Sequence, residues 1–522
     1  FACGRFLWNG ASFLLSYKKL DLQERMGILD LYLLQASFRW GSSGASLAFL
    51  PVSAGVCSGR NFSSRIHAFN KQRTRYRKMK KTYSRREFLK GAALGGAGIL
   101  LASNLFARNC VSSNGRINLG VIGCGKMADG HIGGMIHNDQ CRIVAVCDVD
   151  KARRDYQKSR IEDGYKKRGA AGPEVRTYGD FRELLADPSI DAVLIATPDH
   201  WHAIPAIAAA NAGKAVYCEK PLTFTIEEGR RVVEAVKRTG VPFQVGSQQR
   251  CTPSFKRAAQ LVRNGYAGEI KEVWVGVSPG NATPRNFKEE PLPEGIDWDM
   301  WCGPSALNPY SSQLLPKFNP ARPYDHGWNS WRHHLDYGNG SQADWGAHQF
   351  DIAMWGLGMD GKGPKYIEVS DKGDLPGHNY WRQYKYVMEN GVPMYKGDHP
   401  KAPRYIGGGL TFVGTEAIIA ASRDGFWSDK AHFASSRQQD GDIALLDAEN
   451  HRDNFFSAVL NGTPLAAPVE VGHSSCSVCI LGNIAHNLGR SLEWDWRKEK
   501  FVNDAEADRF LSRTERGQWA VC

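Results

Sequence analysis

The sequence predicts an α/β protein with a doubly wound parallel sheet, followed by an α+β domain around an open, mostly antiparallel sheet. Residues 115–250 alternate between short β-prone strands and helices, a pattern that implies right-handed crossovers and a parallel sheet. Residues 251–450 instead carry longer strands, separated by loops rich in Gly, Pro and Trp. The last segment, 451–522, returns to helical patterns and is expected to pack on the body.

The first strand-helix-strand unit has the outline of a dinucleotide site. An apolar, β-prone run that ends at Ile122 leads directly into Gly123, Gly125 and Ala128, which are spaced as G-x-G-x-x-A. Gly123 permits a tight turn, Gly125 lets the backbone approach a pyrophosphate, and the small Ala128 allows close helix-strand packing. We therefore expect the phosphates of a dinucleotide at the N-terminus of the helix that follows.

The next strand, Cys141 to Cys147, ends at Asp148, an acid whose spacing from the glycines favours NAD. Its carboxylate would accept hydrogen bonds from a ribose 2′-hydroxyl and would repel a 2′-phosphate. Lys151, Arg153 and Arg154 follow closely enough to keep NADP possible. The sequence therefore predicts a nicotinamide cofactor, with NAD favoured.

The other elements are predicted from β-prone runs and from helical periodicity. In the first domain we expect strands at 192–196, 215–218 and 242–246, and helices at 204–211 and 226–238. In the second domain we expect strands at 270–278, 366–370, 383–388, 405–413 and 417–421. The C-terminal segment is expected to hold helices at 454–461 and 475–490.

The net charge of +12 does not indicate a nucleic-acid partner. Residues 1–110 hold 18 Lys and Arg against 4 Asp and Glu, whereas the rest of the chain holds 48 against 50. The basic excess therefore belongs to the N-terminal region. The predicted domains give no electrostatic reason to expect nucleic-acid binding.

Residues 79–110 are similar to a twin-arginine export signal. Ser84 to Lys90 contains the paired arginines with Phe-Leu-Lys, and the small and apolar run after it is short for a membrane span. An amphipathic or membrane-anchoring helix is the alternative. We expect export to the periplasm by the twin-arginine machinery, with cleavage near Ala107. We also expect Met79 to be the true start, so that residues 1–78 would be an over-extended reading frame.

Polar motifs follow two strands of the predicted parallel sheet at their carboxyl ends, where open α/β sheets bind ligands. With the glycine motif and two later motifs they resemble the Gfo/Idh/MocA family of sugar oxidoreductases over residues 117–520. The four motifs are Thr197-Pro198-Asp-His-Trp-His202, Glu219-Lys220-Pro221, Gly246-Ser-Gln-Gln-Arg250 and Asp344-Trp-Gly-Ala-His348-Gln-Phe-Asp351. The resemblance implies a Rossmann domain, a substrate domain, a nicotinamide cofactor and a carbohydrate substrate.

The resemblance also implies a catalytic set of Lys220, Asp344 and His348, and elementary chemistry agrees with it. When a secondary alcohol is oxidised, a hydride leaves carbon for the nicotinamide while a base takes the hydroxyl proton. His348 would be that base, and Lys220 would polarise the hydroxyl and stabilise negative charge on oxygen. Asp344 lies four residues before His348, so on one helix both would project from the same face. There Asp344 could bind a sugar hydroxyl or support the imidazole.

The same motifs assign the remaining site residues, although a strand-end lysine, a core histidine and a helix-capping aspartate are the structural alternatives. The predicted cofactor-binding residues are Gly123, Gly125, Lys126, Met127, Asp148, Thr197, Pro198, His202, Glu219, Lys220 and Gln248. The predicted substrate-binding residues are Lys220, Arg250, Asp344, Trp345 and His348. His200 is expected to be solvated, and Trp345 to form a wall of the site.

No metal is expected. Several potential ligands fall close together in the sequence, but their spacing is not a recognised metal pattern, and the family usually needs none. They are His333, His334, Asp336, Asp344, His348 and Asp351. Cys476 and Cys479 form C-x-x-C in a helix-like run without a second pair, which favours coincidence over a redox or zinc site.

Two enzymatic interpretations remain open. An exported enzyme has no ready pool of NAD, so its cofactor would be tightly bound and regenerated within the site. In the first interpretation, the protein oxidises a secondary hydroxyl of one carbohydrate and reduces another. In the second, a transient keto-sugar allows elimination, which makes the protein a redox-neutral glycosidase or epimerase.

Lys220 favours the oxidoreductase, because some relatives with the hydrolase activity carry Val at this position. A third interpretation is a non-catalytic protein that binds carbohydrate or NAD. The presence of Lys220, Asp344 and His348 argues against it. Because many members of the family associate through the open sheet, the resemblance also implies a homo-oligomer.

Overall fold

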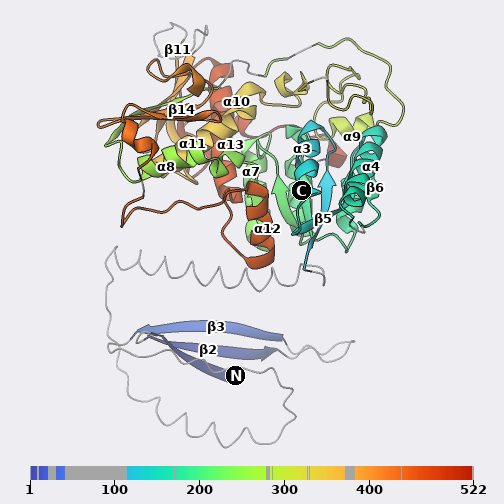
Figure 1. Ribbon diagram of the computed structural model, residues 1–522, viewed down its shortest axis with the longest axis horizontal. Helices are drawn as coiled ribbons and strands as arrows, with labels where there is room; N and C mark the ends of the chain where they lie inside the picture. The colour runs from blue at the N-terminus through green and yellow to red at the C-terminus, as the bar shows by residue number, and fades with distance from the viewer. Residues whose placement is uncertain are drawn as a thin grey trace, which may run out of the picture. The chain divides into compact units, whose positions relative to one another are not determined.

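The computed structural model describes the C-terminal four-fifths of the chain in detail. It covers residues 115–519, apart from 170–171, 278–281, 285, 326, 329, 371–382 and 437. Before residue 115 it describes three strands, β1 (Ala2–Trp8), β2 (Ala11–Leu20) and β3 (Leu31–Trp40), which form an antiparallel sheet of their own (Figure 1). The predicted export signal, 79–110, and its cleavage site lie outside the described residues, as does the rest of 1–78.

The sheet of the first domain is parallel, as predicted, and has six strands, one of which, β6 (Arg176–Tyr178), was not predicted. They are β4 (Ile117–Ile122), β5 (Cys141–Cys147), β6 (Arg176–Tyr178), β7 (Ala192–Ile195), β8 (Ala215–Cys218) and β9 (Phe243–Val245). Their order in the sheet is β6-β5-β4-β7-β8-β9, and every neighbouring pair is parallel. The chain reverses its direction of winding between β4 and β7, and ligands bind at the carboxyl ends of strands at such a switch point.

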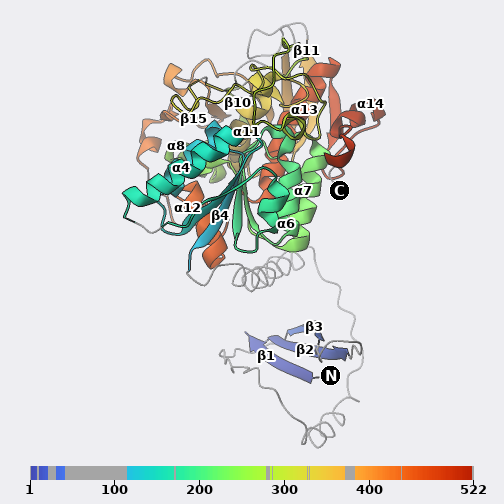
Figure 2. The same ribbon diagram turned by 90° about the vertical axis from the view of Figure 1, so that its right-hand side faces the viewer.

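Helices cover both faces of this sheet (Figures 1 and 2). They are α3 (Lys126–Met135), α4 (Lys151–Lys167), α5 (Phe181–Ala186), α6 (Ala203–Asn211) and α7 (Ile226–Thr239). Because side chains alternate along a strand, Leu119 and Val121 of β4 pack in the core with α3, whereas Ile122 packs in the core with α5, α6 and α7. Both faces are buried, which explains why the strands are almost wholly apolar.

The second domain contains a nine-stranded sheet. Its strands are β10 (Ile270–Val275), β11 (Pro364–Ser370), β12 (Gln383–Met388), β13 (Pro393–Lys396), β14 (Leu410–Gly414), β15 (Ile418–Ser422), β16 (Gly425–Ser428), β17 (Leu492–Asp495) and β18 (Lys500–Phe501). Their order is β16-β15-β14-β10-β13-β12-β11-β17-β18. The pair β10 and β13 is parallel and the other pairs are antiparallel. The predicted fold class is therefore confirmed.

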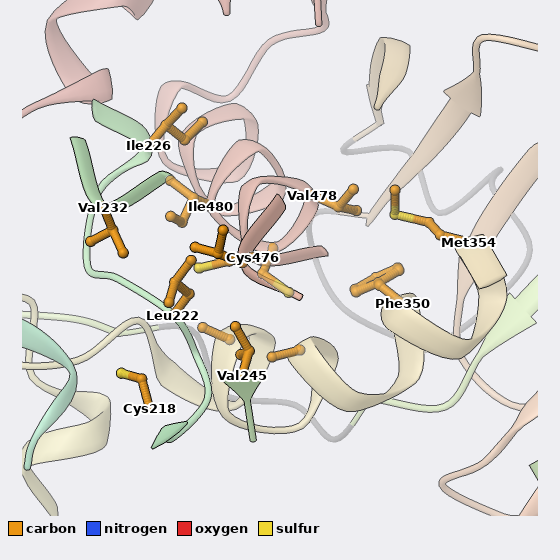
Figure 3. Close-up of a cluster of buried hydrophobic side chains, with 14 of the residues drawn as sticks. Cys218, Leu222, Ile226, Val232, Val245, Phe350, Met354, Cys476, Val478 and Ile480 are labelled. Atoms are coloured by element: carbon orange, nitrogen blue, oxygen red, sulfur yellow. The ribbon is translucent and has the colours of Figure 1, made fainter. Parts of the chain in front are cut away.

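The remaining helices are α8 (Pro253–Arg263), α9 (Trp298–Cys302), α10 (Gly340–Asp344), α11 (Gly346–Leu357), α12 (His451–Asn461), α13 (Val469–Leu488) and α14 (Ala505–Asp508). The long helix α13 is buried between the two domains. Figure 3 shows Cys476, Val478 and Ile480 of α13 lying between Ile226 and Val232 on one side and Phe350 and Met354 on the other. No helix in the described part of the chain is long and apolar enough to cross a membrane.

The C-terminal segment is divided between the two domains. Phe455, Phe456 and Val459 of α12 belong to the core around β4 and α3, whereas β17 and β18 complete one edge of the large sheet. The expectation of a purely helical segment was therefore incomplete. Each of these two strands has only a few residues. A segment this short does not show the alternation of apolar and polar residues by which a strand is recognised in a sequence.

One predicted strand is wrong in its first half. The sequence predicted a continuous strand over 405–413, but the strand β14 begins at Leu410, and Arg404–Ile406 form a turn of 3₁₀ helix. The Gly407-Gly408-Gly409 run separates them. Gly408 adopts a left-handed φ of +72°, and a Cβ on Gly409 would lie 2.1 Å from the carbonyl oxygen of Ala421. The glycines thus form a turn pressed against a neighbouring strand.

Arg250 ties the end of the first domain to helix α11. Its Nε and Nη2 donate to the two carboxylate oxygens of Asp351 at 2.7 and 2.9 Å, and Nη2 also donates to Asp360 at 2.7 Å. The guanidinium lies 5.1 Å from the ring centroid of Trp355. Arg250 and Asp351 are both almost fully buried. A buried ion pair of this kind fixes geometry, because neither charge tolerates the loss of its partner.

We expect Arg250→Met to destabilise the protein by about 3–5 kcal/mol, because it leaves the Asp351 carboxylate buried without a counter-charge. The double variant Arg250→Met/Asp351→Leu should recover much of that loss, since it removes both charges together. Urea denaturation of the single and double variants would measure this. A single variant as stable as the double would contradict the assignment.

Candidate active site

The carboxyl ends of the parallel strands open into one large cavity of about 910 Å³, which is lined by residues of both domains. Every predicted cofactor-binding residue lines it, as do the predicted catalytic residues and Trp345. Arg250 does not line it, because its guanidinium is engaged by Asp351 and Asp360 outside the cavity. The structure thus brings together the predicted site except for Arg250, which supports α11 and is not available to a ligand in this cavity.

The glycine turn has the geometry that a dinucleotide requires. Gly123 has a φ of +89°, and a Cβ there would lie 2.7 Å from the carbonyl oxygen of Ala196. At Gly125, the residue before α3, nothing lies within 4 Å of where a Cβ would be, so there is open space against the backbone. Thr197 Oγ1 is buried at the cavity without a partner among the described residues. Open space and an uncommitted hydroxyl both fit a bound cofactor.

Asp148 follows the neighbouring strand β5 and holds the glycine turn by hydrogen bonds. Its carboxylate accepts hydrogen bonds from the backbone N–H groups of Cys124 at 2.6 Å and Asp150 at 2.8 Å. Burial, and then the nearby charge of Asp150, raise the pKa of Asp148. Each oxygen keeps a further lone pair, so the acid can still accept bonds from a ribose hydroxyl.

The basic residues after Asp148 are differently placed. Arg153 forms a buried ion pair with Asp150, with 3.0 Å between Nε and Oδ2, and Lys151 pairs with Asp155. Arg154 donates from Nη1 to the carbonyl oxygen of Asp148 at 2.8 Å. Of the three, Arg153 lines the cavity.

His202 joins the two polar loops of the first domain. Its Nδ1 lies 2.7 Å from the carbonyl oxygen of Pro221, and its Nε2 lies 2.9 Å from that of Thr197. Burial lowers the pKa of His202, so the ring is neutral and can donate to one carbonyl at a time. His202 lines the cavity, and its contacts hold the loop after β7 against the loop that carries Lys220.

The expectation that His200 is solvated was wrong. His200 is buried, and its ring nitrogens lie 3.0 Å from the carbonyl oxygen of Trp301 and 3.3 Å from that of Tyr337. Burial lowers the pKa of His200 to about 3. The segments that cover it come from the second domain, and the first domain's sequence pattern does not reveal them.

A buried network fixes the backbone just before Lys220. Glu219 Oε1 lies 2.7 Å from His131 Nε2 of α3 and accepts a hydrogen bond from Gln248 Nε2 at 2.7 Å. Burial alone would raise the pKa of Glu219, but the bond to His131 and the charges of His131 and Lys220 outweigh it and lower the pKa. The carboxylate therefore stays ionised, held between α3 and the Gln248 loop.

Lys220 bridges the two domains across the cavity. Its Nζ donates to Asp344 Oδ1 at 2.6 Å and to the carbonyl oxygen of Asp344 at 2.8 Å. Arg332 Nε lies 3.6 Å from the same carboxylate oxygen. Burial would raise the pKa of Asp344, but Lys220 and Arg332 outweigh it and lower the pKa to about 2. Asp344 is therefore charged throughout the physiological range.

Asp344 and His348 do not lie on one continuous helix, contrary to the prediction. Helix α10 ends at Asp344, and α11 begins at Gly346, with Trp345 between them. Both side chains still line the cavity. Asp344 faces Lys220, whereas His348 Nδ1 is buried without a hydrogen-bond partner among the described residues.

His348 has the properties of a base. Burial, and then the charges of Lys220 and Arg423, lower its pKa well below the ordinary value. The imidazole is therefore neutral at pH 7 and has a nitrogen able to accept a proton. Trp345 is 38% exposed and stands beside His348, with 6.4 Å between the ring centroids. Its position fits the predicted role of a cavity wall.

The sequence did not identify three polar residues of the cavity: Asp199, Arg332 and Arg423. Asp199 lies within the Thr197–His202 motif and is 5% exposed. Burial raises its pKa to about 7, although the charge of Arg332 opposes this. The Arg332 guanidinium lies 4.7 Å from the ring centroid of Trp328 and 4.3 Å from that of Trp331. In the sequence, only the nearby tryptophans pointed to Arg332 as a site residue. Nothing in the sequence pointed to Arg423.

The cysteine and metal patterns give no sign of a second reactive centre. Cys476 and Cys479 are buried in α13, and burial raises the pKa of both thiols, that of Cys476 to about 12. Thiols in this state are poor nucleophiles. No group of three or more His, Cys, Asp or Glu side chains in the described part of the chain is arranged to hold a metal ion.

The two glycines of the turn should respond differently to alanine. Gly125→Ala should weaken NAD binding at least about tenfold, because its methyl group occupies the space that a pyrophosphate needs, while the apo fold keeps its stability. Gly123→Ala should also lower the melting temperature of the apo protein, since it imposes strain and a clash with Ala196. NAD titration and thermal unfolding would separate the two effects. Equal melting temperatures for both variants would contradict this reading.

Asp199 should make stability depend on pH. Its folded pKa of about 7 lies above the ordinary 3.8, so its contribution is fully present below pH 3.8 and is lost as pH rises through 7. Asp199→Asn mimics the protonated acid and should be more stable than the parent at pH 8, by up to about 4 kcal/mol. At pH 4 the two should be nearly equal. Thermal unfolding from pH 4 to 8 would measure the difference, and a constant gap would exclude Asp199 as its source.

Comparison with known proteins places this arrangement in a family. Residues 117–247 match the NAD-binding Rossmann fold of the Gfo/Idh/MocA oxidoreductase family, and residues 262–521 match the C-terminal alpha/beta domain of the same family. An inositol 2-dehydrogenase of Saccharopolyspora erythraea is 38% identical over 154 residues, which cover 29% of this chain and 42% of the relative. A glycosyl hydrolase family 109 protein of Stenotrophomonas maltophilia is 31% identical over 199 residues, which cover 37% of this chain and 41% of the relative.

The similarity to solved structures concerns the fold. The WlbA dehydrogenase of Chromobacterium violaceum, solved with NADH and UDP-GlcNAcA, is 18% identical with a TM-score of 0.50, over 74% of this chain and 97% of that one. The first curated relatives are matched over 42% to 54% of their length. The two family models together cover most of the chain and include the glycine turn, Lys220, Asp344 and His348. The chain therefore belongs to the Gfo/Idh/MocA family of oxidoreductases, with an NAD-binding Rossmann domain.

Proposed function

We propose that the protein is an exported, NAD-dependent oxidoreductase that acts on a secondary hydroxyl of a sugar or glycoside. The observation that carries the proposal is the arrangement of Lys220, Asp344 and His348. An ion pair of 2.6 Å and a neutral, buried imidazole line the same cavity as the glycine turn. An alcohol oxidation needs this combination of a base and a cation near the reacting oxygen.

Each residue of the catalytic set has a separate role. His348 lines the cavity with a neutral imidazole and accepts the proton of the substrate hydroxyl. Lys220 stabilises the negative charge that develops on that oxygen, and Asp344 holds the Lys220 ammonium in position. NAD, when bound, supplies the acceptor for the hydride. Trp345 and Trp328 offer aromatic faces to a sugar ring.

Export and tight cofactor binding are part of the proposal. The twin-arginine motif of residues 79–110 supports transport to the periplasm as a folded protein. NAD would then be loaded inside the cell and regenerated within the site, because the periplasm has no pool to exchange with. The family resemblance also leads us to propose a homo-oligomer.

A redox-neutral glycosidase or epimerase is the second candidate. The similarity to a glycosyl hydrolase family 109 protein favours it, whereas the similarity to an inositol 2-dehydrogenase favours the oxidoreductase. The same residues serve either route, since both begin with hydride transfer from a secondary alcohol. The two routes differ in whether the cofactor ends reduced.

The test begins with protein expressed from Met79. The mass and absorbance of any bound cofactor would be recorded before and after mixing with a panel of sugars and glycosides. Reduced nicotinamide would support the oxidoreductase, whereas product without net reduction would favour the redox-neutral route. A purified protein that holds no cofactor would contradict tight binding.

Substitution of the catalytic set should lower turnover far more than it weakens NAD binding. Lys220→Met should lower kcat by about 10²–10³-fold, because one charge-stabilising donor is lost. His348→Asn should lower kcat by about 10²–10⁴-fold, because the base is lost. Lys237→Met is a matched control, since Lys237 is an exposed lysine of α7 outside the cavity. Rates within threefold of the parent for Lys220→Met would overturn the assignment.

A further inference from the structure

Arg423 is a cation of the cavity that the proposed chemistry does not use. It follows β15 in the turn to β16 and lines the cavity beside Trp345 and His348. Two other cations of the cavity, Lys220 and Arg332, both lie within ion-pair distance of the Asp344 carboxylate. Within the described ranges of the chain, no carboxylate lies within ion-pair distance, 4.0 Å, of the Arg423 guanidinium. Its charge is therefore not neutralised by the protein.

The guanidinium is nevertheless held in place. Its Cζ lies 4.8 Å from the ring centroid of Trp345. With the Gln249 amide oriented to satisfy both its groups, Arg423 Nε donates to the amide oxygen at 3.2 Å, and the amide nitrogen donates to the carbonyl oxygen of His348 at 3.2 Å. Arg423 is thus fixed relative to the backbone of the proposed base, while its two Nη groups have no protein acceptor among the described residues.

Arg423 lies at the part of the cavity that holds His348, the proposed base. Its charge is one of the causes that lower the pKa of His348, and the charge of Asp344 attracts it. Burial lowers the pKa of Arg423 itself, which reflects partial loss of water around the guanidinium. A cation that is oriented, partly dehydrated and uncompensated gains most from a ligand that brings a negative charge.

The balance of charges indicates how large that negative charge is. Of the charged residues that line the cavity, Lys126 and Arg153 are balanced in number by Asp148 and Glu219. The others are three cations, Lys220, Arg332 and Arg423, and the two acids Asp344 and Asp199. Asp199 has a pKa of about 7 and is only partly ionised at pH 7, so the excess lies between one and two positive charges, and a singly charged oxyanion never exceeds it. A phosphate monoester carries about −1.5 to −2 charges at pH 7 and would exceed it whenever Asp199 is ionised. The free pair of Nη donors also matches two oxygens of one anion.

We propose that the natural substrate is an acidic sugar, whose singly charged oxyanion, a carboxylate or a sulfate ester, pairs with Arg423. This inference rests on the proposed function, because it assigns the substrate class of the same site. It makes Arg423 a specificity-determining residue: it selects among sugars and takes no part in the proton or hydride transfer.

The test compares matched sugars with the NAD-loaded protein. The probes are methyl β-D-glucuronide, methyl β-D-glucoside 6-sulfate and neutral methyl β-D-glucoside, together with the corresponding free sugars. Two readouts are recorded: binding by calorimetry, and the rate of nicotinamide reduction or product formation. We expect at least one charged sugar to be preferred over its neutral partner by about tenfold or more in both readouts, and the two charged probes distinguish carboxylate from sulfate.

The variants Arg423→Gln and Arg423→Lys show whether this residue is the cause. Arg423→Gln should reduce the ratio of charged to neutral affinity to near one, and Arg423→Lys should keep part of it, because it retains the charge but loses the planar pair of donors. Arg404→Gln is the matched control: it removes the same charge from a nearby exposed arginine outside the cavity, and should leave the ratio unchanged.

Failure of this inference is distinguishable from failure of the proposed function. Turnover of neutral sugars in preference to both charged ones would overturn the role of Arg423 and leave the oxidoreductase intact. A preference for charged sugars that survives in Arg423→Gln would do the same. If no sugar is bound or converted while NAD is retained, the proposed function itself fails, and this inference falls with it.

Discussion

The site depends on the contact between Lys220 and Asp344, because it joins the two domains across the cavity. Lys220 follows a strand of the parallel sheet, whereas Asp344 ends a short helix of the second domain. Their contact of 2.6 Å fixes the distance between the domain that holds the glycine turn and the helix that carries His348. Arg250 and Asp351 make a second connection to the same helix one turn further along. A ligand that spans the cavity therefore meets groups whose relative positions are already set.

Electrostatics in the cavity follow from burial combined with an excess of cations. Removal from water favours the neutral form of every group, and it does so for His348 and Asp199. Lys220 and Arg332 reverse that effect at Asp344, which remains charged. The result is a neutral imidazole beside a charged pair, so base and cation coexist at the same pH without neutralising each other. Arg423 adds a positive charge that no carboxylate of the described residues pairs with. Under the proposal above, this charge makes the cavity prefer acidic sugars over neutral ones.

Long-range packing explains where the sequence reasoning failed. His200 sits in a motif that otherwise lines the cavity, but segments some 100 residues later in the chain cover it. The spacing of Asp344 and His348 suggested one helix, yet the chain breaks at Trp345. Arg250 belongs to a motif of the family resemblance, but the buried carboxylate of Asp351 and the partly exposed carboxylate of Asp360 pair with its guanidinium. For His200 and Arg250, a contact between distant segments overrode the local pattern.

Elements and motifs that rest on local physics could be predicted from the amino-acid order alone. The glycine turn from Gly123 to Ala128 follows from backbone freedom, the parallel sheet follows from alternating strands and helices, and Asp148 follows from its place at a strand end. Lys220, Asp344 and His348 were identified by motif. Only the tertiary structure decided what each of them faces: that Asp344 holds Lys220, that burial keeps His348 neutral, and that Arg423 lines the cavity. Burial and pairing depend on segments that are remote in the chain, and no local pattern of residues encodes them.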